Sequence, residues 1–347
     1  MKYSNVYIDS FGYELAPVVV NSKDLEKRLE PVYKKMRLNP GQLEALTGIY
    51  ERRYWPSIHS MHEGASIAAK RAIAKSGLSP SDIGMVVYGG VCRDNIEPAT
   101  ACSVADCIGV SSKAVVYDVS NACLGVLTGM IQVANAIELG QIKAGIVVSS
   151  ESARQIVDMT IERLIASPDM ETFKKTIATM TGGSGAVAVL LTSKELSDKG
   201  HRLKGGVLRN AVKHHKLCIW GPDAGMMGRG AEVFMETDSV GVLTNGTILG
   251  KETYDEFRKE MELADDQPDK VICHQVGSAH QKLILESLGI SAGKDYATYP
   301  YLGNIGTVSL PLTAAIASER EFLQKNDLVA FLGIGSGLNC MMLAIEW

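Results

Sequence analysis

The sequence predicts a layered α/β protein built from two similar halves. Short apolar, β-branched runs alternate along the chain with amphipathic helical patterns. This alternation is typical of strands that are buried on both faces beneath covering helices. An internal repeat divides the 347 residues into two parts. With 46% hydrophobic and 21% charged residues, the chain has the composition of a folded protein with a sizeable core.

Three features of the first half return in the second half at a nearly constant offset. The paired features are Asp82 and Asp269, Asn121 and Asn304, and the strands at 145–148 and 328–332. Their offsets are 187, 183 and roughly 184 residues, which agree too well for coincidence. We therefore expect a first half over residues 1–195 and a second half over residues 196–347.

Two helical segments of the first half stand out. The pattern at 61–76 predicts an amphipathic covering helix with Ile67, Ala68 and Ile73 on its apolar face. The charged stretch 154–180 also has a helical pattern, and it has no counterpart in the second half. We interpret it as a helical insertion that caps a pocket.

Charge and cysteine usage exclude several classes of function. Thirty-five Lys and Arg against 39 Asp and Glu give a net charge of −4 without a basic block, so no nucleic-acid partner is expected. The seven cysteines form no CxxC pair and no metal-ligand spacing, so neither a disulfide framework nor a metal site is expected. A cleavable leader and a long apolar run are also missing, which predicts a cytoplasmic protein without a membrane span.

Cys123 is the candidate nucleophile of the first half. The apolar run 115–119 predicts a buried strand, and residues 120–125 turn that strand into a helix. Cys123 would then lie at or next to a helix N-terminus, where unpaired backbone N–H groups and the helix dipole favour the thiolate over the thiol. The alternative is a structural cysteine that happens to follow a strand.

The second half carries polar groups at its equivalents of the same turns. His274 ends an apolar strand and Asn304 enters a helix, although a histidine in such a place is often structural. The repeat predicts that both converge with Cys123 where the halves meet, giving a nucleophile, a proton handler and an amide in one place. A glycine-rich turn at 333–337, expected after the last strand, either punctuates the chain or lets backbone N–H groups form an oxyanion hole.

Taken in order, these motifs make the sequence resemble the β-ketoacyl-ACP synthase III family of the thiolase superfamily over essentially its whole length. The stretches that carry the resemblance are 47–53, 120–125, 182–190, 274–275, 303–304, 309–311 and 335–337. The resemblance implies a thiolase-like fold, in which the duplicated halves form a five-layered αβαβα sandwich. It also implies a homodimer.

The chemistry implied by this resemblance is a ping-pong acyl transfer. Cys123 accepts an acyl group from a thioester, and a carbon nucleophile then attacks the acyl-enzyme. His274 and Asn304 match the family positions that polarise the thioester carbonyl of the second substrate and stabilise its enolate. The backbone N–H groups of Cys123 and Ser336 match the oxyanion hole for the acyl intermediate.

Two departures from the priming-synthase pattern bear on the substrates. Gln42 and Leu46 stand where that family has a tryptophan and an arginine that help to hold the adenine end of coenzyme A. Coenzyme A is then gripped differently, or the donor differs. Glu97 stands where priming synthases carry an apolar residue before proline, on a loop that reaches across the dimer.

Glu97 is the candidate general base. A malonyl substrate forms its carbanion by losing carbon dioxide, whereas an ordinary acyl thioester must lose an α-proton, which a carboxylate with a raised pKa in an apolar tunnel can accept. Glu97 lies 26 residues before Cys123, and this spacing and its surroundings resemble the OleA branch, which joins two long acyl-CoA molecules head to head. The alternative is a solvated loop residue or the start of the next helix.

The sequence therefore predicts an acyltransferase that condenses two fatty acyl-CoA molecules, without decarboxylation, to a β-keto acid or its thioester. The alternatives are a decarboxylative synthase III that uses malonyl-ACP and a non-catalytic partner subunit of the same fold. We expect acyl-CoA or acyl-ACP as substrate and no cofactor. Methionines in the stretch 220–228 line an acyl tunnel or belong to a surface loop. The substrate-binding positions are assigned to Gly335, Gly337, Met226 and Met227.

Overall fold

A nine-stranded sheet, with the strand order β11-β12-β13-β8-β1-β7-β6-β4-β5, forms the centre of the protein. The structure is a computed structural model that describes residues 1–196, 200–222 and 233–347. The strands of this sheet are β1 (Val6–Leu15), β4 (Met85–Tyr88), β5 (Val115–Asp118), β6 (Ala144–Glu151), β7 (Gly185–Ser193), β8 (His201–Asn210), β11 (Lys270–Cys273), β12 (Leu328–Gly335) and β13 (Asn339–Glu346). Two small hairpins pair β2 (Val18–Asn21) with β3 (Glu51–Tyr54) and β9 (Cys218–Pro222) with β10 (Val233–Thr237).

Both halves of the chain use the same pattern of strand pairing. In the first half β4 is parallel to β6, β6 is antiparallel to β7, and β7 is antiparallel to β1. In the second half β11 is parallel to β12, β12 is antiparallel to β13, and β13 is antiparallel to β8. The halves join where β1 pairs with β8 through Tyr7 and Ile8. The boundary at residue 195 stays a prediction.

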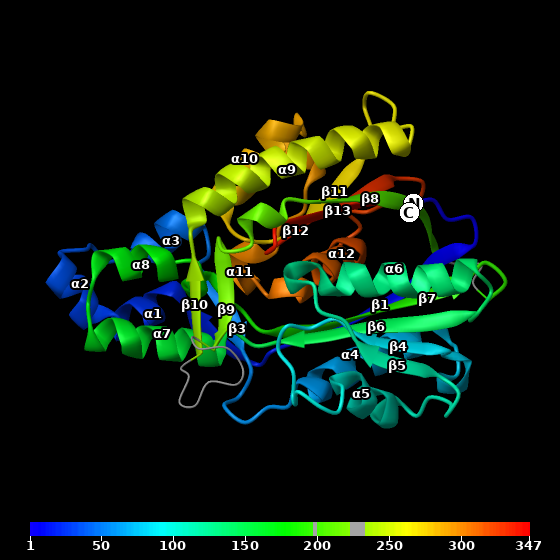
Figure 1. Ribbon diagram of the computed structural model, residues 1–347, viewed down its shortest axis with the longest axis horizontal. Helices are drawn as coiled ribbons and strands as arrows, with labels where there is room; N and C mark the ends of the chain where they lie inside the picture. Colours follow the sequence, from blue (N-terminus) through cyan, green and yellow to red (C-terminus); the bar gives the residue numbers. More distant parts are fainter. Residues whose placement is uncertain (197–199, 223–232) are drawn as a thin grey trace.

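The helices lie in three layers that alternate with two layers of strands (Figure 1). Figure 1 shows α9 and α10 over β11, β12, β13 and β8, then α6 and α12 in the middle, then β1, β7, β6, β4 and β5, and finally α4 and α5. This arrangement confirms the five-layered αβαβα fold. The helices are α1 (Ser22–Arg28), α2 (Glu30–Met36), α3 (Gln42–Thr47), α4 (Met61–Ser76), α5 (Thr100–Ile108), α6 (Gly125–Glu138), α7 (Arg154–Ala166), α8 (Met170–Thr176), α9 (Ser239–Glu260), α10 (Ser278–Leu288), α11 (Tyr299–Leu302) and α12 (Ser309–Glu319).

Each interface between layers has its own apolar core. The middle core contains α6 and α12 residues together with residues from both strand layers, such as Val189 and Phe331, which are fully buried. A second core packs the alanines of α4 against β4 and β6, and a third packs α9 and α10 against β11, β12 and β13. Strands buried on both faces explain why their sequences are continuous apolar runs and do not alternate.

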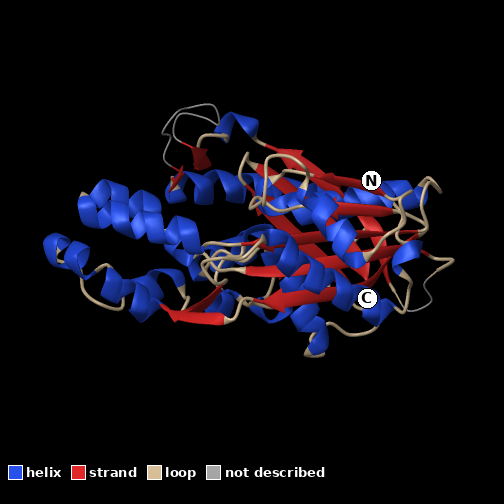
Figure 2. Cartoon of the chain, turned by 90° about the horizontal axis from the view of Figure 1, so that it is seen from below, coloured by secondary structure: helices blue, strands red, loops and turns tan. Residues whose placement is uncertain are grey.

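The helices α1, α2, α7 and α8 form a separate group at one end of the sheets. Figure 2 shows this group from below, projecting beyond the strands. Its apolar core includes Leu29, Val157 and Phe173, all buried. The charged stretch predicted to be helical therefore does form two helices, α7 and α8. Its role as a cap over a pocket stays a prediction.

Two details of the predicted elements are wrong. Ile67 lies on the predicted apolar face of α4, but it is 41% exposed, because alanines and Ile73 form the buried face and bring the helix close to the sheet. The glycine-rich turn at 333–337 does not follow the last strand. Gly333 and Gly335 belong to β12, and the strand β13 continues the chain.

The close approach of α4 to β1 makes a testable prediction at Gly12. A β-carbon added there would lie 2.0 Å from the carbonyl oxygen of Ala68 and 2.6 Å from the backbone nitrogen of Ala72, which neither helix nor strand can relieve without moving. We expect Gly12→Ala to lower the free energy of unfolding by about 1–3 kcal/mol, measured by urea denaturation. Gly221→Ala is the control, because a β-carbon there meets no atom of the described residues within 4 Å. Equal stability of the two variants would contradict the tight packing of α4 on β1.

Candidate acyl-transfer site

Cys123 lies in a short 3-10 turn, η2 (Ala122–Leu124), between the end of β5 and the start of α6. The preceding residue, Ala122, has a φ of 45°, a left-handed conformation that residues with a β-carbon rarely adopt. Such a conformation costs on the order of 1–3 kcal/mol and persists where the surrounding structure enforces it, often at functional sites. The predicted turn from a strand into a helix is thus present, and Cys123 lies within it. The prediction that this strand is buried is wrong, because β5 lies at the end of the nine-stranded sheet and is exposed to half-buried.

Glycines bring other backbone segments against this turn. A β-carbon on Gly335, at the end of β12, would lie 3.3 Å from the backbone nitrogen of Cys123 and 3.6 Å from its β-carbon. A β-carbon on Gly125, the first residue of α6, would lie 1.8 Å from the carbonyl oxygen of Gly89. The cysteine turn is therefore packed between the end of β4 in its own half and the end of β12 in the other half.

The elements that carry His274 and Asn304 meet the same turn. His274 follows β11, and its backbone N–H donates to the carbonyl of Leu332 on β12 at 3.0 Å. Asn304 lies just before the 3-10 turn η6 (Gly306–Val308), in which the hydroxyl of Thr307 accepts the backbone N–H of Val126 at 2.7 Å. The structure thus brings the elements with Cys123, His274 and Asn304 together where the halves meet. The catalytic roles of the three side chains stay predictions.

Asn304 is held firmly in this place. Its Oδ1 accepts the backbone N–H of Gly306 at 3.0 Å, so the other end of the amide, Nδ2, points away from that turn. Its backbone N–H donates to the carbonyl of Thr181 at 2.9 Å, and its carbonyl accepts the N–H of Gly183 at 2.8 Å. The glycine stretch that begins at Gly182 therefore docks the Asn304 turn of the second half onto the first half.

Burial controls the protonation of both reactive groups. Together with smaller contributions from charge on Cys218 and Glu151, it raises the pKa of the Cys123 thiol to about 12. Burial likewise lowers the pKa of His274 to about 3, with a smaller contribution from His280. Both groups are therefore neutral at pH 7. Loss of hydration thus opposes the helix N-terminus, which favours the thiolate, and the balance between the two effects is tested by the labelling experiment below.

Glu151 is a residue that the sequence reasoning missed. It ends β6, is 4% exposed, and accepts the backbone N–H of Val91 at 2.7 Å through Oε1 and that of Cys92 at 3.0 Å through Oε2. Burial raises its pKa to about 7, against the lowering effect of these two hydrogen bonds. The sequence held a signal for this residue. The roughly 184-residue repeat makes Glu151 the counterpart of Gly335, and Glu151 is the one charged residue at the end of an otherwise uncharged strand.

Glu97 is not brought to Cys123 within one chain. It lies in the loop 89–99 between β4 and α5, three residues before α5 begins, and it is exposed, unlike the base in an apolar tunnel that we expected. Its side chain has no hydrogen-bond or ion-pair partner among the described residues. It also does not start the helix, since Thr100 does.

The remaining predicted residues have separate outcomes. Ser336 and Gly337 lie in the hairpin between β12 and β13, next to the contact of Gly335 with the cysteine turn. Met226 and Met227 lie outside the described residues.

In the parts of the chain that the structure describes, no three His, Cys, Asp or Glu residues gather as metal ligands. None of the helices described there is both long and apolar enough to cross a membrane.

The raised pKa of Cys123 predicts how its thiol reacts with an alkylating agent. Because the thiolate is the reactive form, the rate of iodoacetamide labelling at Cys123 should rise about tenfold per pH unit from pH 6 to 10 without a plateau. Mass spectrometry of the labelled peptide gives this rate, and the Cys123→Ala variant shows the background from the other cysteines. A plateau below pH 8 would mean that the helix N-terminus lowers the pKa after all.

The chain is similar to known proteins over its full length. Residues 117–210 match the family model for 3-oxoacyl-[acyl-carrier-protein (ACP)] synthase III, and residues 259–347 match the model for its C-terminal part. A Shewanella oneidensis protein named acyl-CoA:acyl-CoA alkyltransferase is 53% identical over 353 residues, covering 100% of both chains. A β-ketoacyl-[acyl-carrier-protein] synthase III from Natranaerobius thermophilus is more distant, at 26% identity over 99% of this chain and 100% of its own.

Solved structures of Xanthomonas campestris OleA share the whole fold. The cerulenin-bound form has a TM-score of 0.94 and 33% identity, covering 100% of this chain and 98% of that chain. A cysteine-to-serine variant with bound lauric acid and lauroyl-CoA has a TM-score of 0.93 and 33% identity, covering 99% and 100%. In other variants of that OleA, the replaced glutamate stands 26 residues before the replaced cysteine, the same separation as between Glu97 and Cys123. This chain is therefore an acyltransferase of the thiolase-fold 3-oxoacyl-ACP synthase III family, on the branch of the acyl-CoA:acyl-CoA alkyltransferases.

Proposed function

We propose that this enzyme joins two fatty acyl-CoA molecules head to head in a non-decarboxylative Claisen condensation. The observation that carries the proposal is the 26-residue spacing of Glu97 and Cys123, in a chain that matches an acyl-CoA:acyl-CoA alkyltransferase over its full length. A base is needed for such a condensation and is not needed for a decarboxylative one. Coenzyme A enters this reaction as part of the substrate. The catalytic groups are side chains and backbone N–H groups of the protein.

In the first half-reaction, Sγ of Cys123 attacks the thioester carbonyl of one acyl-CoA. The backbone N–H groups of Cys123 and Ser336 donate to the oxyanion of the tetrahedral intermediate, where fixed donors are worth most. The carbon–sulfur bond to coenzyme A breaks, and the thiol proton leaves with the coenzyme A thiol. The neutral thiol of the resting enzyme thus loses its proton when the acyl donor is bound.

In the second half-reaction, the carbonyl oxygen of the other acyl-CoA accepts hydrogen bonds from the neutral imidazole of His274 and from Nδ2 of Asn304. These bonds stabilise the enolate that forms when a carboxylate removes the α-proton. The α-carbon then attacks the acyl-cysteine carbonyl, a carbon–carbon bond forms, and the Cys123 sulfur leaves as a thiolate that takes up the proton removed by the carboxylate. The product is a β-ketoacyl-CoA, which water converts into a β-keto acid and free coenzyme A.

The carboxylate in this step is Glu97 of the partner subunit in a homodimer. Glu97 is exposed at the tip of its loop in the single chain, as expected for a residue that reaches into a second copy. The strand β5 supports such pairing, because it lies at the end of the nine-stranded sheet and its Val115 is 47% exposed. Burial at the partner's site would supply the apolar surroundings that raise the pKa of a carboxyl group.

Product analysis tests the reaction type. We expect purified enzyme with one long-chain acyl-CoA and no malonyl thioester to form a doubled-chain β-keto acid, or the ketone that it yields by losing carbon dioxide, detected by mass spectrometry. The same incubation with Cys123→Ala is the control. Product that forms only after malonyl-CoA or malonyl-ACP is added would instead establish a decarboxylative synthase, and no acyl adduct at Cys123 with any thioester would leave a non-catalytic subunit.

The two half-reactions test the assignment of the base. We expect Glu97→Gln to keep acylation of Cys123 by acyl-CoA, read as a mass increase of the intact protein, but to lower condensation by about 100- to 10,000-fold, since an amide cannot accept the α-proton. Cys123→Ala should lose both steps. The matched control is Glu260→Gln, an exposed glutamate at the end of α9. Equal loss of acylation and condensation in Glu97→Gln would refute the base assignment.

A further inference from the structure

The buried carboxylate of Glu151 accepts hydrogen bonds from two consecutive backbone N–H groups at the base of the loop 89–99, here called the Glu97 loop. The strand β4 ends at Tyr88, so Val91 and Cys92 lie outside the sheet and have no strand partner among the described residues. Their N–H groups donate to Oε1 and Oε2 of Glu151. Two donors side by side need two acceptor atoms. A carboxylate offers both oxygens, whereas an amide offers one oxygen and a competing donor.

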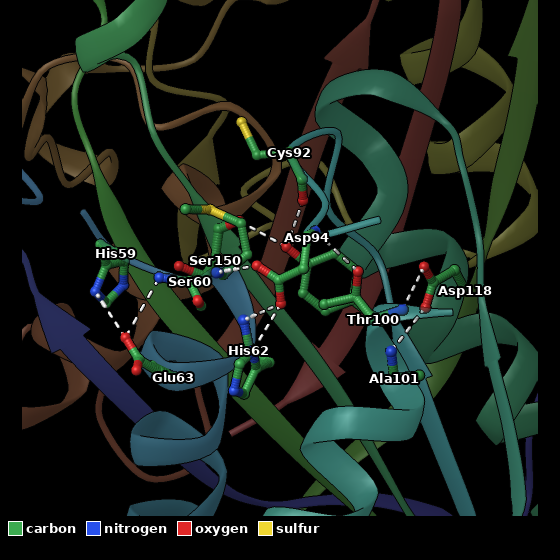
Figure 3. Close-up of polar contacts among 12 residues, drawn as sticks. His59, Ser60, His62, Glu63, Cys92, Asp94, Thr100, Ala101, Asp118 and Ser150 are labelled. Carbon is green, nitrogen blue, oxygen red and sulfur yellow. Dashed lines mark hydrogen bonds and ion pairs between the residues drawn. The ribbon is translucent and has the colours of Figure 1, made fainter. Parts of the chain in front are cut away.

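Further contacts fix the rest of the loop and leave its tip exposed. The carboxylate of Asp94 accepts the backbone N–H of His62 at 3.0 Å and pairs with its ring at 2.8 Å, and that of Asp118 accepts the N–H of Thr100 at 3.0 Å. Figure 3 shows Asp94 and His62 pointing toward one another and Asp118 pointing at the start of α5. Between these anchors Ile96 is 81% exposed and Glu97 is exposed as well.

Glu151 also faces the other components of the acyl-transfer site. A β-carbon on Gly306 would lie 3.6 Å from Cγ and Cδ of Glu151, so the turn that follows Asn304 packs directly against this side chain. Negative charge on Glu151 also contributes to the raised pKa of the Cys123 thiol. One side chain therefore contacts both the base of the Glu97 loop and the Asn304 turn.

We propose that Glu151 is a positioning residue that holds the Glu97 loop in the conformation needed to deliver Glu97 to the partner subunit. This inference rests on the proposed function, because it assigns to Glu151 a role exerted through Glu97. Glu151 itself does not touch the reacting atoms in this proposal. Its substitution should therefore affect the step that uses Glu97, the condensation, and spare the acylation of Cys123.

The first test compares the two half-reactions in Glu151→Gln. We expect acylation of Cys123 within about twofold of the unmodified enzyme and condensation lowered about 100-fold, the size of effect that misplacing a catalytic group by about 1 Å produces. The double variant with Glu97→Gln should condense no more slowly than Glu97→Gln alone, since both act through one group. Equal losses of acylation and condensation in Glu151→Gln, or multiplied losses in the double variant, would overturn the proposal.

Glu26→Gln is the matched control. Glu26 is another buried glutamate, 7% exposed, whose oxygens accept the backbone N–H groups of Gly41 at 2.7 Å and Leu43 at 2.8 Å, in a different part of the fold. Its substitution removes the same kind of hydrogen bond and should change both half-reactions equally. A selective loss of condensation in this control as well would show that any such buried substitution has the effect, and would overturn the proposal.

Mixed dimers, purified through two different tags, separate the proposal from the proposed function. When Glu151→Gln pairs with Cys123→Ala, the remaining cysteine site receives Glu97 from a subunit with an intact Glu151, so about half of the condensation activity should return. Glu97→Gln paired with Cys123→Ala should recover in the same way. No recovery of either pair refutes the delivery of Glu97 across the dimer, whereas recovery of the Glu97→Gln pair alone means that Glu151 acts within its own site and overturns the present inference.

A second variant tests the role of Glu151 if Glu151→Gln does not fold. Circular dichroism and thermal unfolding report whether Glu151→Gln is folded, and Glu151→Asp is the second variant if it is not. Aspartate keeps both acceptor oxygens on a side chain shorter by one methylene group. We expect it to show the same selective loss of condensation at a smaller magnitude, about tenfold. Full condensation activity in a folded Glu151→Asp enzyme with unchanged acylation would overturn the proposal.

Discussion

The close packing of the Cys123 turn between two backbone segments is the constraint on which the site depends. The turn strains Ala122 into a left-handed conformation, leaves no room for a side chain at Gly125, and would be crowded by one at Gly335. One of the contacting segments ends β4 in the same half, and the other ends β12 in the opposite half. Because interiors resist deformation, fixing these backbones also fixes the position of the Cys123 turn.

A second constraint is electrostatic. The thiol of Cys123 and the imidazole of His274 are both neutral in the resting site, so few uncompensated charges are buried between the halves. In the proposed reaction, charge then develops only on the oxyanion and on the enolate, where fixed N–H donors in a low-dielectric site act most strongly. Glu151 is the exception, and its two backbone hydrogen bonds offset part of the cost of its burial.

The sequence predicts what depends on local pattern and misses what depends on packing or on a second molecule. The helix α4 begins and ends as predicted because Ser60 and Gly77 cap it, yet Ile67 faces outward because small alanines allow a closer approach to the sheet. The elements of Cys123, His274 and Asn304 meet as the repeat predicts. The raised pKa of Cys123 depends on desolvation by the whole fold, which no local motif encodes.

Glu151 and Glu97 illustrate the same limits. Glu151 was hidden at the end of a strand that reads as core, and its importance depends on contacts with segments about 60 and 155 residues away. Glu97 matches its family position, but a single chain leaves it exposed. In the proposed mechanism its surroundings come from another subunit, which sequence spacing alone does not describe.

The participation of Gly335 in the cysteine turn has a consequence for protein synthesis. Gly335 is translated 212 residues after Cys123, and at about 5–20 residues per second this delay is on the order of 10–40 s. Throughout that interval, the nascent chain carries Cys123 without the backbone contact that β12 provides. We therefore expect the Cys123 thiol to be more accessible to oxidants and metal ions on the nascent chain than in the finished enzyme.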